Sequence, residues 1–154
     1  TLNLGRSGDT SESTAARFDE DVLPFRPRYL LIMTGINSIR AGVPAESVIR
    51  DLRIIRYKCL LQGIRPILLT LPPINPAAIA RAFGQETSPD WQQELSKVND
   101  FIRRQTYYVD LYPHFADERG ELPERLAIDG LHYDIAGKQL MAAIINADWD
   151  RVTR

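Results

Sequence analysis

The chain has 154 residues and a mass of 17.5 kDa, which fits a single domain with a hydrophobic core. A hydrophobic share of 44% argues against intrinsic disorder, and a net charge of −1 leaves no basic excess for nucleic-acid binding. A single cysteine, Cys59, excludes an internal disulfide and a multi-cysteine zinc site. No apolar run approaches the roughly 20 residues of a membrane span, and the first residues contain neither a start methionine nor a signal peptide.

Short β-rich runs alternate with longer helical stretches along the chain. The apolar pattern predicts strands over residues 29–34, 66–71 and 107–111. It predicts helices over about 44–62, 91–104 and 134–146, a short helix over 77–83, and one helical turn near Pro123. A further helix is expected to begin at Asp9 or Thr10.

Capping residues and buried faces follow from the same pattern. Pro44 suits the first helical position, Gly63 the residue after that helix, and Ser88 the cap of the helix at 91. The expected inner face of the helix over 44–62 consists of Val48, Leu52, Ile55 and Cys59. The expected inner face of the last helix consists of Ile135, Gln139, Met141, Ile144 and Ile145.

This alternation predicts an α/β fold in which right-handed crossovers join parallel strands and helices cover both sheet faces. Ligands bind such sheets at the carboxyl ends of the strands. Three segments lie there: the loop after Leu4, the loop after Thr34, and the loop before the last helix.

The first of these segments runs from Asn3 to Thr10 and contains Gly5 and Gly8. A sharp glycine turn followed by a helix start exposes backbone N–H groups, which can stabilise a developing oxyanion. A strand-to-helix turn with capping residues explains the same pattern without any catalytic role.

The second segment, after Thr34, contains Gly35 and Asn37. An asparagine just past a buried strand can direct its amide across the strand ends as an oxyanion donor. An Asx-turn that only shapes the loop is the structural alternative.

The third segment is Asp129-Gly130-Leu131-His132. An aspartate three residues before a histidine, with a glycine between them, can place its carboxylate against Nδ1 and leave Nε2 free as a general base. A solvated histidine near a helix start is the alternative. The other histidine, His114, follows Asp110 by four residues and is not expected to take part in catalysis.

Together the three segments resemble signature blocks of the SGNH hydrolases, also called the GDSL esterase/lipase family. Residues 3–10 resemble the second block, Gly35-Ile36-Asn37 the Gly-x-Asn of the third, and Asp129 to His132 the Asp-x-x-His of the fifth. The resemblance extends from residue 1 to about residue 146.

The resemblance implies a three-layer α/β/α fold with a flavodoxin-like parallel sheet. It also implies a serine hydrolase of small-molecule carboxylic esters or thioesters that needs neither a metal nor an organic cofactor. On the family pattern, His132 is the general base and Asp129 orients it, while the Gly8 N–H and the Asn37 amide bind the oxyanion.

Two departures from the family concern neighbours of these residues. Ser38 stands where many relatives have aspartate, and Tyr133 stands where many have proline. Both bear on substrate preference more than on the chemistry.

A larger departure concerns the nucleophile. The family serine follows the first strand in a Gly-Asp-Ser motif, and Gly8-Asp9-Thr10 matches that motif in spelling only. The substitutes Ser7, Ser11, Ser13 and Ser38 do not follow the expected strand either.

The first strand is central in a flavodoxin-like sheet, so its loss would leave two neighbouring strands with unpaired edges. Residues 1–154 are therefore expected to form one domain that is incomplete at its N-terminus. The strand and its serine would come from residues upstream of Thr1, from a cleaved peptide or from another chain. A non-catalytic relative that binds an ester or carbohydrate is the second interpretation, and a flavodoxin-like binding domain outside the family is the third.

Overall fold

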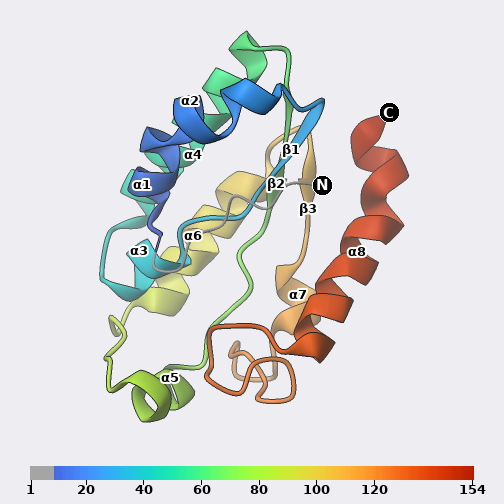
Figure 1. Ribbon diagram of the computed structural model, residues 1–154. Helices are drawn as coiled ribbons and strands as arrows, with labels where there is room; N and C mark the ends of the chain where they lie inside the picture. Colours follow the sequence, from blue (N-terminus) through green and yellow to red (C-terminus); the bar gives the residue numbers. More distant parts are fainter. Residues whose placement is uncertain (1–8) are drawn as a thin grey trace.

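The computed structural model describes residues 9–154 (Figure 1). The predicted loop after Leu4 and the candidate oxyanion donor Gly8 lie outside the described residues.

Helices and strands alternate through the described part of the chain. In chain order they are α1 (Ser11–Ala16), α2 (Phe18–Asp21), the 3₁₀ helix η1 (Leu23–Phe25), β1 (Tyr29–Ile32), α3 (Ile36–Arg40), α4 (Ala45–Leu61), β2 (Arg65–Leu69), α5 (Pro76–Phe83), α6 (Trp91–Arg103), β3 (Tyr108–Val109), α7 (Tyr112–Phe115) and α8 (Ile135–Thr153).

The three strands form one parallel sheet in the order β1-β2-β3. Tyr29 pairs with Arg65 and Leu68 with Tyr108, so the strands run in the same direction and end at the same edge. The segments that follow β1 and β2, including α3 and α5, lie at that edge (Figure 1). The carboxyl edge of the sheet is therefore where residues from distant parts of the sequence meet.

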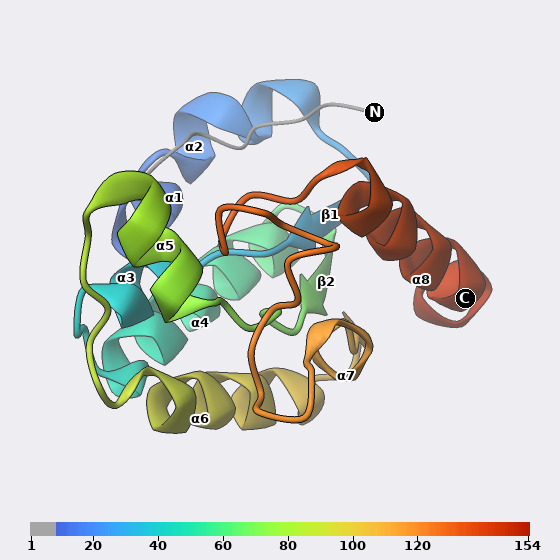
Figure 2. The same ribbon diagram turned by 90° about the horizontal axis from the view of Figure 1, so that it is seen from below.

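Side chains that alternate along β2 supply two separate cores, one on each sheet face. Leu68 belongs to a buried cluster with residues of α1, α2, α4 and α6, whereas Ile67 and Leu69 belong to a second cluster with residues of α7 and α8. Figure 2 shows α8 on the opposite side of the sheet from α4. The predicted three-layer α/β/α arrangement is confirmed.

The predicted inner face of α4 is confirmed, because Val48, Leu52, Ile55 and Cys59 are all buried. Two capping predictions are wrong. Pro44 is extended and lies at the N-cap, one residue before α4, whereas Asp90 holds the N-cap of α6. The Ser88 hydroxyl donates to the Asp90 carboxylate (2.6 Å) and so does not cap the helix.

Two predictions near the C-terminus need correction. The third strand comprises only Tyr108–Val109, because the chain turns into α7, whose Pro113 favours a helix start. The last helix continues to Thr153, and two of its predicted inner residues are exposed, namely Ile135 (75%) and Gln139. Ile135 lies in the first turn of α8, which extends beyond the end of β3 (Figure 1).

Within residues 9–154, β1 has a neighbouring strand on one side only. The Arg28 carbonyl accepts from the Arg65 N–H (2.9 Å), so the backbone groups of alternate residues from Tyr29 onward point to the open side. On the sheet face that α8 covers elsewhere, Leu31 and Met33 remain 40% and 39% exposed. The β1 edge of the sheet is therefore open within the described residues and has exposed apolar side chains beside it.

The turn after β2 is held by a buried asparagine of α6. Asn99 is 1% exposed, donates to the Leu71 carbonyl (3.0 Å) and accepts from the Leu71 N–H (2.8 Å). The backbone N–H and carbonyl of Leu71 thereby both have a hydrogen-bond partner in the protein interior, where water could not take its place.

We predict that Asn99→Leu lowers the free energy of unfolding by about 2–5 kcal/mol, because it leaves two buried backbone groups without partners. Urea-induced unfolding measures this loss. The control is Gln93→Ala on the exposed face of the same helix. Equal stability of the two variants would contradict a structural role for Asn99.

Candidate active site

The loop before α8 brings Asp129 and His132 into direct contact. His132 Nδ1 lies 2.9 Å from Asp129 Oδ2, and the Asp129 Oδ1 atom accepts from the backbone N–H groups of His132 (2.7 Å) and Leu131 (2.9 Å). The carboxylate therefore closes a tight turn and holds the imidazole at the same time. The His132 side chain is 58% exposed, which leaves its Nε2 edge accessible.

Gly130 fixes the position of this turn against the rest of the protein. The Asn75 N–H donates to the Gly130 carbonyl (3.0 Å), and Asn75 in turn caps α5 through its side chain (3.2 Å to the Ala78 N–H). Gly130 has φ +81°, and a Cβ atom there would lie 2.5 Å from the Asn75 carbonyl oxygen. Glycine is thus required both for the backbone conformation and for the close approach.

The surroundings of Asp129 favour its charged form. Partial burial is the largest single influence and raises its pKa, but the N–H of His132, its imidazole and the N–H of Leu131 together outweigh burial. The net result is a pKa below the usual 3.8. An ionised Asp129 accepts a hydrogen bond from Nδ1–H, so Nε2 is the nitrogen without a proton when the imidazole is neutral.

An aromatic side chain supports the imidazole from α5. The ring of Phe83 meets that of His132 edge to face, with 5.9 Å between centroids. Phe83 is the last residue of α5, and Asn75 at the other end of α5 holds Gly130, so this short helix contacts the loop at both ends.

Asn37 lies in the first turn of α3, directly after β1. The turn into α3 needs Gly35, whose φ is +125° and whose added Cβ would lie 2.7 Å from Val48 Cγ1. The Asn37 Nδ2 donates to the Asp9 carbonyl (2.9 Å), and its Oδ1 accepts from Arg40 Nη1 (3.1 Å). Among residues 9–154 only one of the two amide hydrogens has an acceptor, so within this part of the chain the second can bind another one.

The contact with Asp9 brings Asn37 to the residue that follows Gly8. Whether the Gly8 N–H points to the same place lies outside the described residues. The predicted helix start nearby is confirmed to within two residues, since Thr10 caps α1 in a reciprocal arrangement with Ser13.

The serines and the threonine considered as substitute nucleophiles have structural partners. Ser11 is 1% exposed and donates to Asp51 Oδ2 (2.7 Å), while its N–H donates to the Ser38 hydroxyl (3.2 Å). Thr10 and Ser13 cap α1. Among residues 9–154, no serine or threonine hydroxyl is hydrogen-bonded to His132, and Ser7 lies outside that range.

A buried hydrogen-bonded cluster gives the serine at position 38, where many relatives have aspartate, a structural role; it consists of Ser11, Ser38 and Asp51. Ser38, which occupies the position after Asn37, ties α3 to the start of α1 and, through Ser11, to Asp51 of α4. This cluster fixes α3, and with it the backbone that carries Asn37.

His114 is not joined to the carboxylate that precedes it by four residues. Asp110 instead accepts from the Thr70 hydroxyl (2.9 Å) and from Arg103 Nε (3.1 Å) and Nη2 (3.2 Å). His114 itself is exposed in α7.

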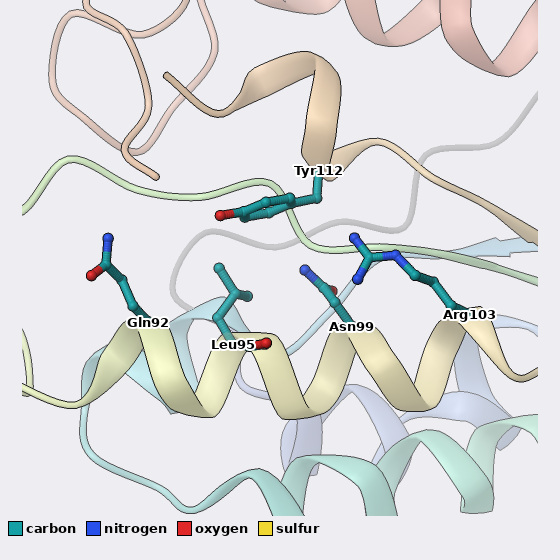
Figure 3. Close-up of a pocket in the computed structure, with 6 residues that line it drawn as sticks. Gln92, Leu95, Asn99, Arg103 and Tyr112 are labelled. Atoms are coloured by element: carbon teal, nitrogen blue, oxygen red, sulfur yellow. The ribbon is translucent and has the colours of Figure 1, made fainter. Parts of the chain in front are cut away.

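A small cavity of about 70 Å³ lies between α6 and α7 (Figure 3), and its lining does not include Asn37, Asp129 or His132. The ring of Tyr112 faces α6 across it, and Gln92, Leu95, Ser96, Asn99 and Arg103 line the other side. Because Asn99 binds Leu71 and Arg103 binds Asp110, their polar groups already have partners. We assign no ligand to this cavity.

Two kinds of feature are absent from the part of the chain that the structure describes. No group of three or more histidine, cysteine, aspartate or glutamate side chains there could hold a metal ion. No helix there is long and apolar enough to cross a membrane.

The sequence indicates that the stretch from Ile74 to Asp90 frames the pocket, with Phe83 among the candidate apolar lining residues, but it does not predict the individual contacts. Asn75 meets Gly130 and Phe83 meets His132 across a long sequence separation, so no local pattern marks these pairs. Arg40 follows Asn37 by three residues, a spacing at which helical side chains meet, and it could have been found once α3 was recognised as a helix.

Comparisons with known proteins place the chain among hydrolases. A family model described as GDSL-like lipase/acylhydrolase matches residues 1–140. An acetylxylan esterase of Geobacillus stearothermophilus is 27% identical over 92% of this chain and 68% of its own length. An uncharacterized lipoprotein of Bacillus subtilis, YqeF, is 39% identical over 47% of this chain, which spans only 32% of that protein.

Solved structures show the same fold. A GDSL-like lipase from Bacteroides thetaiotaomicron superposes with a TM-score of 0.79 at 22% identity, over 94% of this chain and 73% of its own. A lipase/acylhydrolase from Enterococcus faecalis gives a TM-score of 0.74 at 24% identity, over 95% and 73%.

We predict that Gly130→Ala lowers the free energy of unfolding by about 2–5 kcal/mol, from the unfavourable backbone conformation plus the clash with Asn75. Gly63→Ala is the matched control, since Gly63 has φ +69° but nothing within 4 Å of an added Cβ. It should lose only about 1–2 kcal/mol in the same urea titration. Equal losses would mean that the loop does not depend on its contact with Asn75.

We also predict that Asp129 stabilises the fold in a pH-dependent way. Its pKa is lower in the folded protein than in the unfolded chain, so the contribution is full above the unfolded value and is lost as pH falls through the folded value. The Tm of Asp129→Asn should therefore lie below that of the wild type at about pH 6, and the gap should close below about pH 4. Thermal unfolding between about pH 4 and pH 6 measures this difference in Tm. Gly63→Ala is the control, because its difference from the wild type should not change with pH. A constant difference for Asp129→Asn would refute the prediction.

Proposed function

Because this chain belongs to the GDSL-like lipase/acylhydrolase family, we propose that it supplies the general base and the oxyanion donors of a serine ester hydrolase. The observation that carries the proposal is the Asp129–His132 pair, in which a carboxylate holds Nδ1 at 2.9 Å while the ring is exposed. Family membership sets aside a binding domain outside this family.

In the proposed reaction, a serine Oγ attacks the carbonyl carbon of a carboxylic ester or thioester. His132 Nε2 accepts the serine proton and later donates it to the leaving alcohol or thiol. Asp129 stays ionised, keeps the proton of Nδ1 in place and stabilises the imidazolium that forms. Water then attacks the acyl-serine with His132 again as the base, which releases the acid and restores the hydroxyl.

The negative charge of the tetrahedral intermediate needs donors already in position. We assign this role to the second amide hydrogen of Asn37, the one not bonded to the Asp9 carbonyl, and to the N–H of Gly8. The hydrogen bond from Asn37 to the Asp9 carbonyl supports the pairing, because it holds the amide beside the residue that follows Gly8.

The nucleophile is proposed to come from a strand that pairs with the open edge of β1. Such a strand would cover unpaired backbone groups of β1, and the helix after it would cover Leu31 and Met33. If parallel to β1, it would end at the same edge of the sheet as Asn37, where its last residues would face the carbonyl of the substrate.

The substrate class is a carboxylic ester. A relative that covers nearly the whole chain is named an acetylxylan esterase, so short-chain acyl esters, acetylated carbohydrates among them, are the first substrates to test.

We predict that His132→Ala lowers kcat/KM for 4-nitrophenyl acetate about 10²–10⁴-fold, and Asn37→Ala about 10²–10³-fold. The assay uses the protein that contains both this chain and the serine-bearing strand. Labelling by a fluorophosphonate probe should slow in His132→Ala, because the probe reacts only with an activated serine.

His114→Ala is the matched control, since His114 is exposed and is not among the residues that hydrogen-bond to the Asp129 carboxylate within residues 9–154. Its hydrolysis and labelling rates should stay within about twofold of the wild type. Unchanged labelling in His132→Ala would show that another group activates the serine.

A further inference from the structure

The oxyanion donor Asn37 has an arginine partner on its own helix. Arg40 lies three residues later in α3, and its Nη1 donates to the Asn37 Oδ1 atom (3.1 Å). Residues at this spacing share a helix face, so the contact follows from the helix itself.

An asparagine amide can turn over and exchange its oxygen for its nitrogen, and only the nitrogen can bind an oxyanion. In this protein both ends of the amide are specified. Arg40 carries only donors and must face the oxygen, whereas the Asp9 carbonyl is only an acceptor and must face the nitrogen.

We propose, on the basis of the ester hydrolase function proposed above, that Arg40 is a positioning residue that locks the Asn37 amide with its nitrogen towards the oxyanion. It acts through Asn37 and does not touch the substrate. Its positive charge beside Oδ1 also polarises the amide, which makes the remaining N–H a stronger donor to a negatively charged oxygen.

Arg40 is itself held in place from the loop after α5. Its Nη2 donates to Gln85 Oε1 (2.8 Å), and its backbone carbonyl accepts from the Ser88 N–H (2.9 Å). Burial lowers the pKa of Arg40, although the group remains charged at any ordinary pH. Partial removal from water strengthens the hydrogen bond to Asn37 relative to one at an open surface.

The anchor of Arg40 is close in sequence to the residue that supports the base. Phe83 contacts the imidazole of His132, and Gln85, two residues later, holds Arg40. The segment from Phe83 to Gln85 therefore contacts both Arg40, which supports the proposed oxyanion donor, and His132, the proposed base. Arg40 and His132 lie about a hundred residues apart in the sequence.

The test compares Arg40→Met, Arg40→Lys and Gln85→Ala in the ester hydrolase that contains its serine-bearing strand. Arg40→Met should lower kcat about 10-fold with KM within about twofold, because a loosely held donor retains part of the 10²–10³-fold effect of the whole group. Arg40→Lys keeps a charged donor and should recover most of kcat. Gln85→Ala removes a partner of Arg40 and should give a smaller loss of kcat than Arg40→Met. Because Gln85 is exposed, this variant should fold and so tests the proposal even if Arg40→Met folds poorly.

A direct readout comes from NMR of the Asn37 side-chain amide, whose ¹⁵N and ¹H signals should move towards those of a solvated asparagine in Arg40→Met. Arg81→Met is the control, because Arg81 is an exposed arginine of α5 that pairs with Glu124 (2.8 Å). It should change neither kcat nor the amide signals.

Three results would overturn the proposal. A raised KM with kcat intact would mean that Arg40 binds the substrate, and unchanged kcat in Arg40→Met would remove its role. A loss of kcat with unchanged Asn37 signals would mean that Arg40 acts by another route. If the wild-type protein hydrolyses no ester, the proposed function fails, and the amide signals still test whether Arg40 fixes the orientation of Asn37.

Discussion

The geometry of the candidate base depends on the close approach of two backbone segments, the turn at Asn75 and the turn at Gly130. The hydrogen bond between them (3.0 Å) leaves no room for a Cβ atom at Gly130. Because Asn75 follows β2 and is held near it through the Leu71–Asn99 contacts, the sheet and α6 together determine where His132 lies. A residue on a surface loop thereby gains the fixed position that general base catalysis needs.

The helix that carries Asn37, the proposed oxyanion donor, is held in place by different contacts. Here α3 is too short to be stable alone, and buried hydrogen bonds from Ser38 through Ser11 to Asp51 join it to α1 and α4. Buried polar groups with partners give a single arrangement, since any shift would leave one of them unpaired in the interior. A main-chain contact thus positions the loop of the proposed base, whereas a side-chain network positions the proposed oxyanion donor.

The sequence predicted the parts of this protein that local rules control. The presence of the three strands, the Asp129–His132 spacing and the position of Asn37 after β1 all follow from patterns within ten residues, and the three-layer fold follows from the alternation of elements. Prediction failed at the ends of elements, where competing contacts between near neighbours decide the outcome. The turn into α7 shortens β3, and the Asp90 carboxylate takes the Ser88 hydroxyl that would otherwise cap α6. The sequence indicates that the stretch from Ile74 to Asp90 frames the pocket, but the contacts of Asn75 with Gly130 and of Gln85 with Arg40 depend on tertiary packing and have no local pattern.

The open edge of β1 connects the fold to the chemistry. An edge strand with exposed Leu31 and Met33 beside it is an unfavourable surface unless another strand and helix cover it. Parallel pairing is the arrangement that the rest of the sheet uses, and it would bring the end of an added strand to the edge where α3 begins. A hydroxyl presented at that point would have the Asn37 amide on the β1 side. The interaction that completes the sheet would therefore also complete the site. For this reason the proposed nucleophile and the stability of β1 are expected to depend on the same proposed strand.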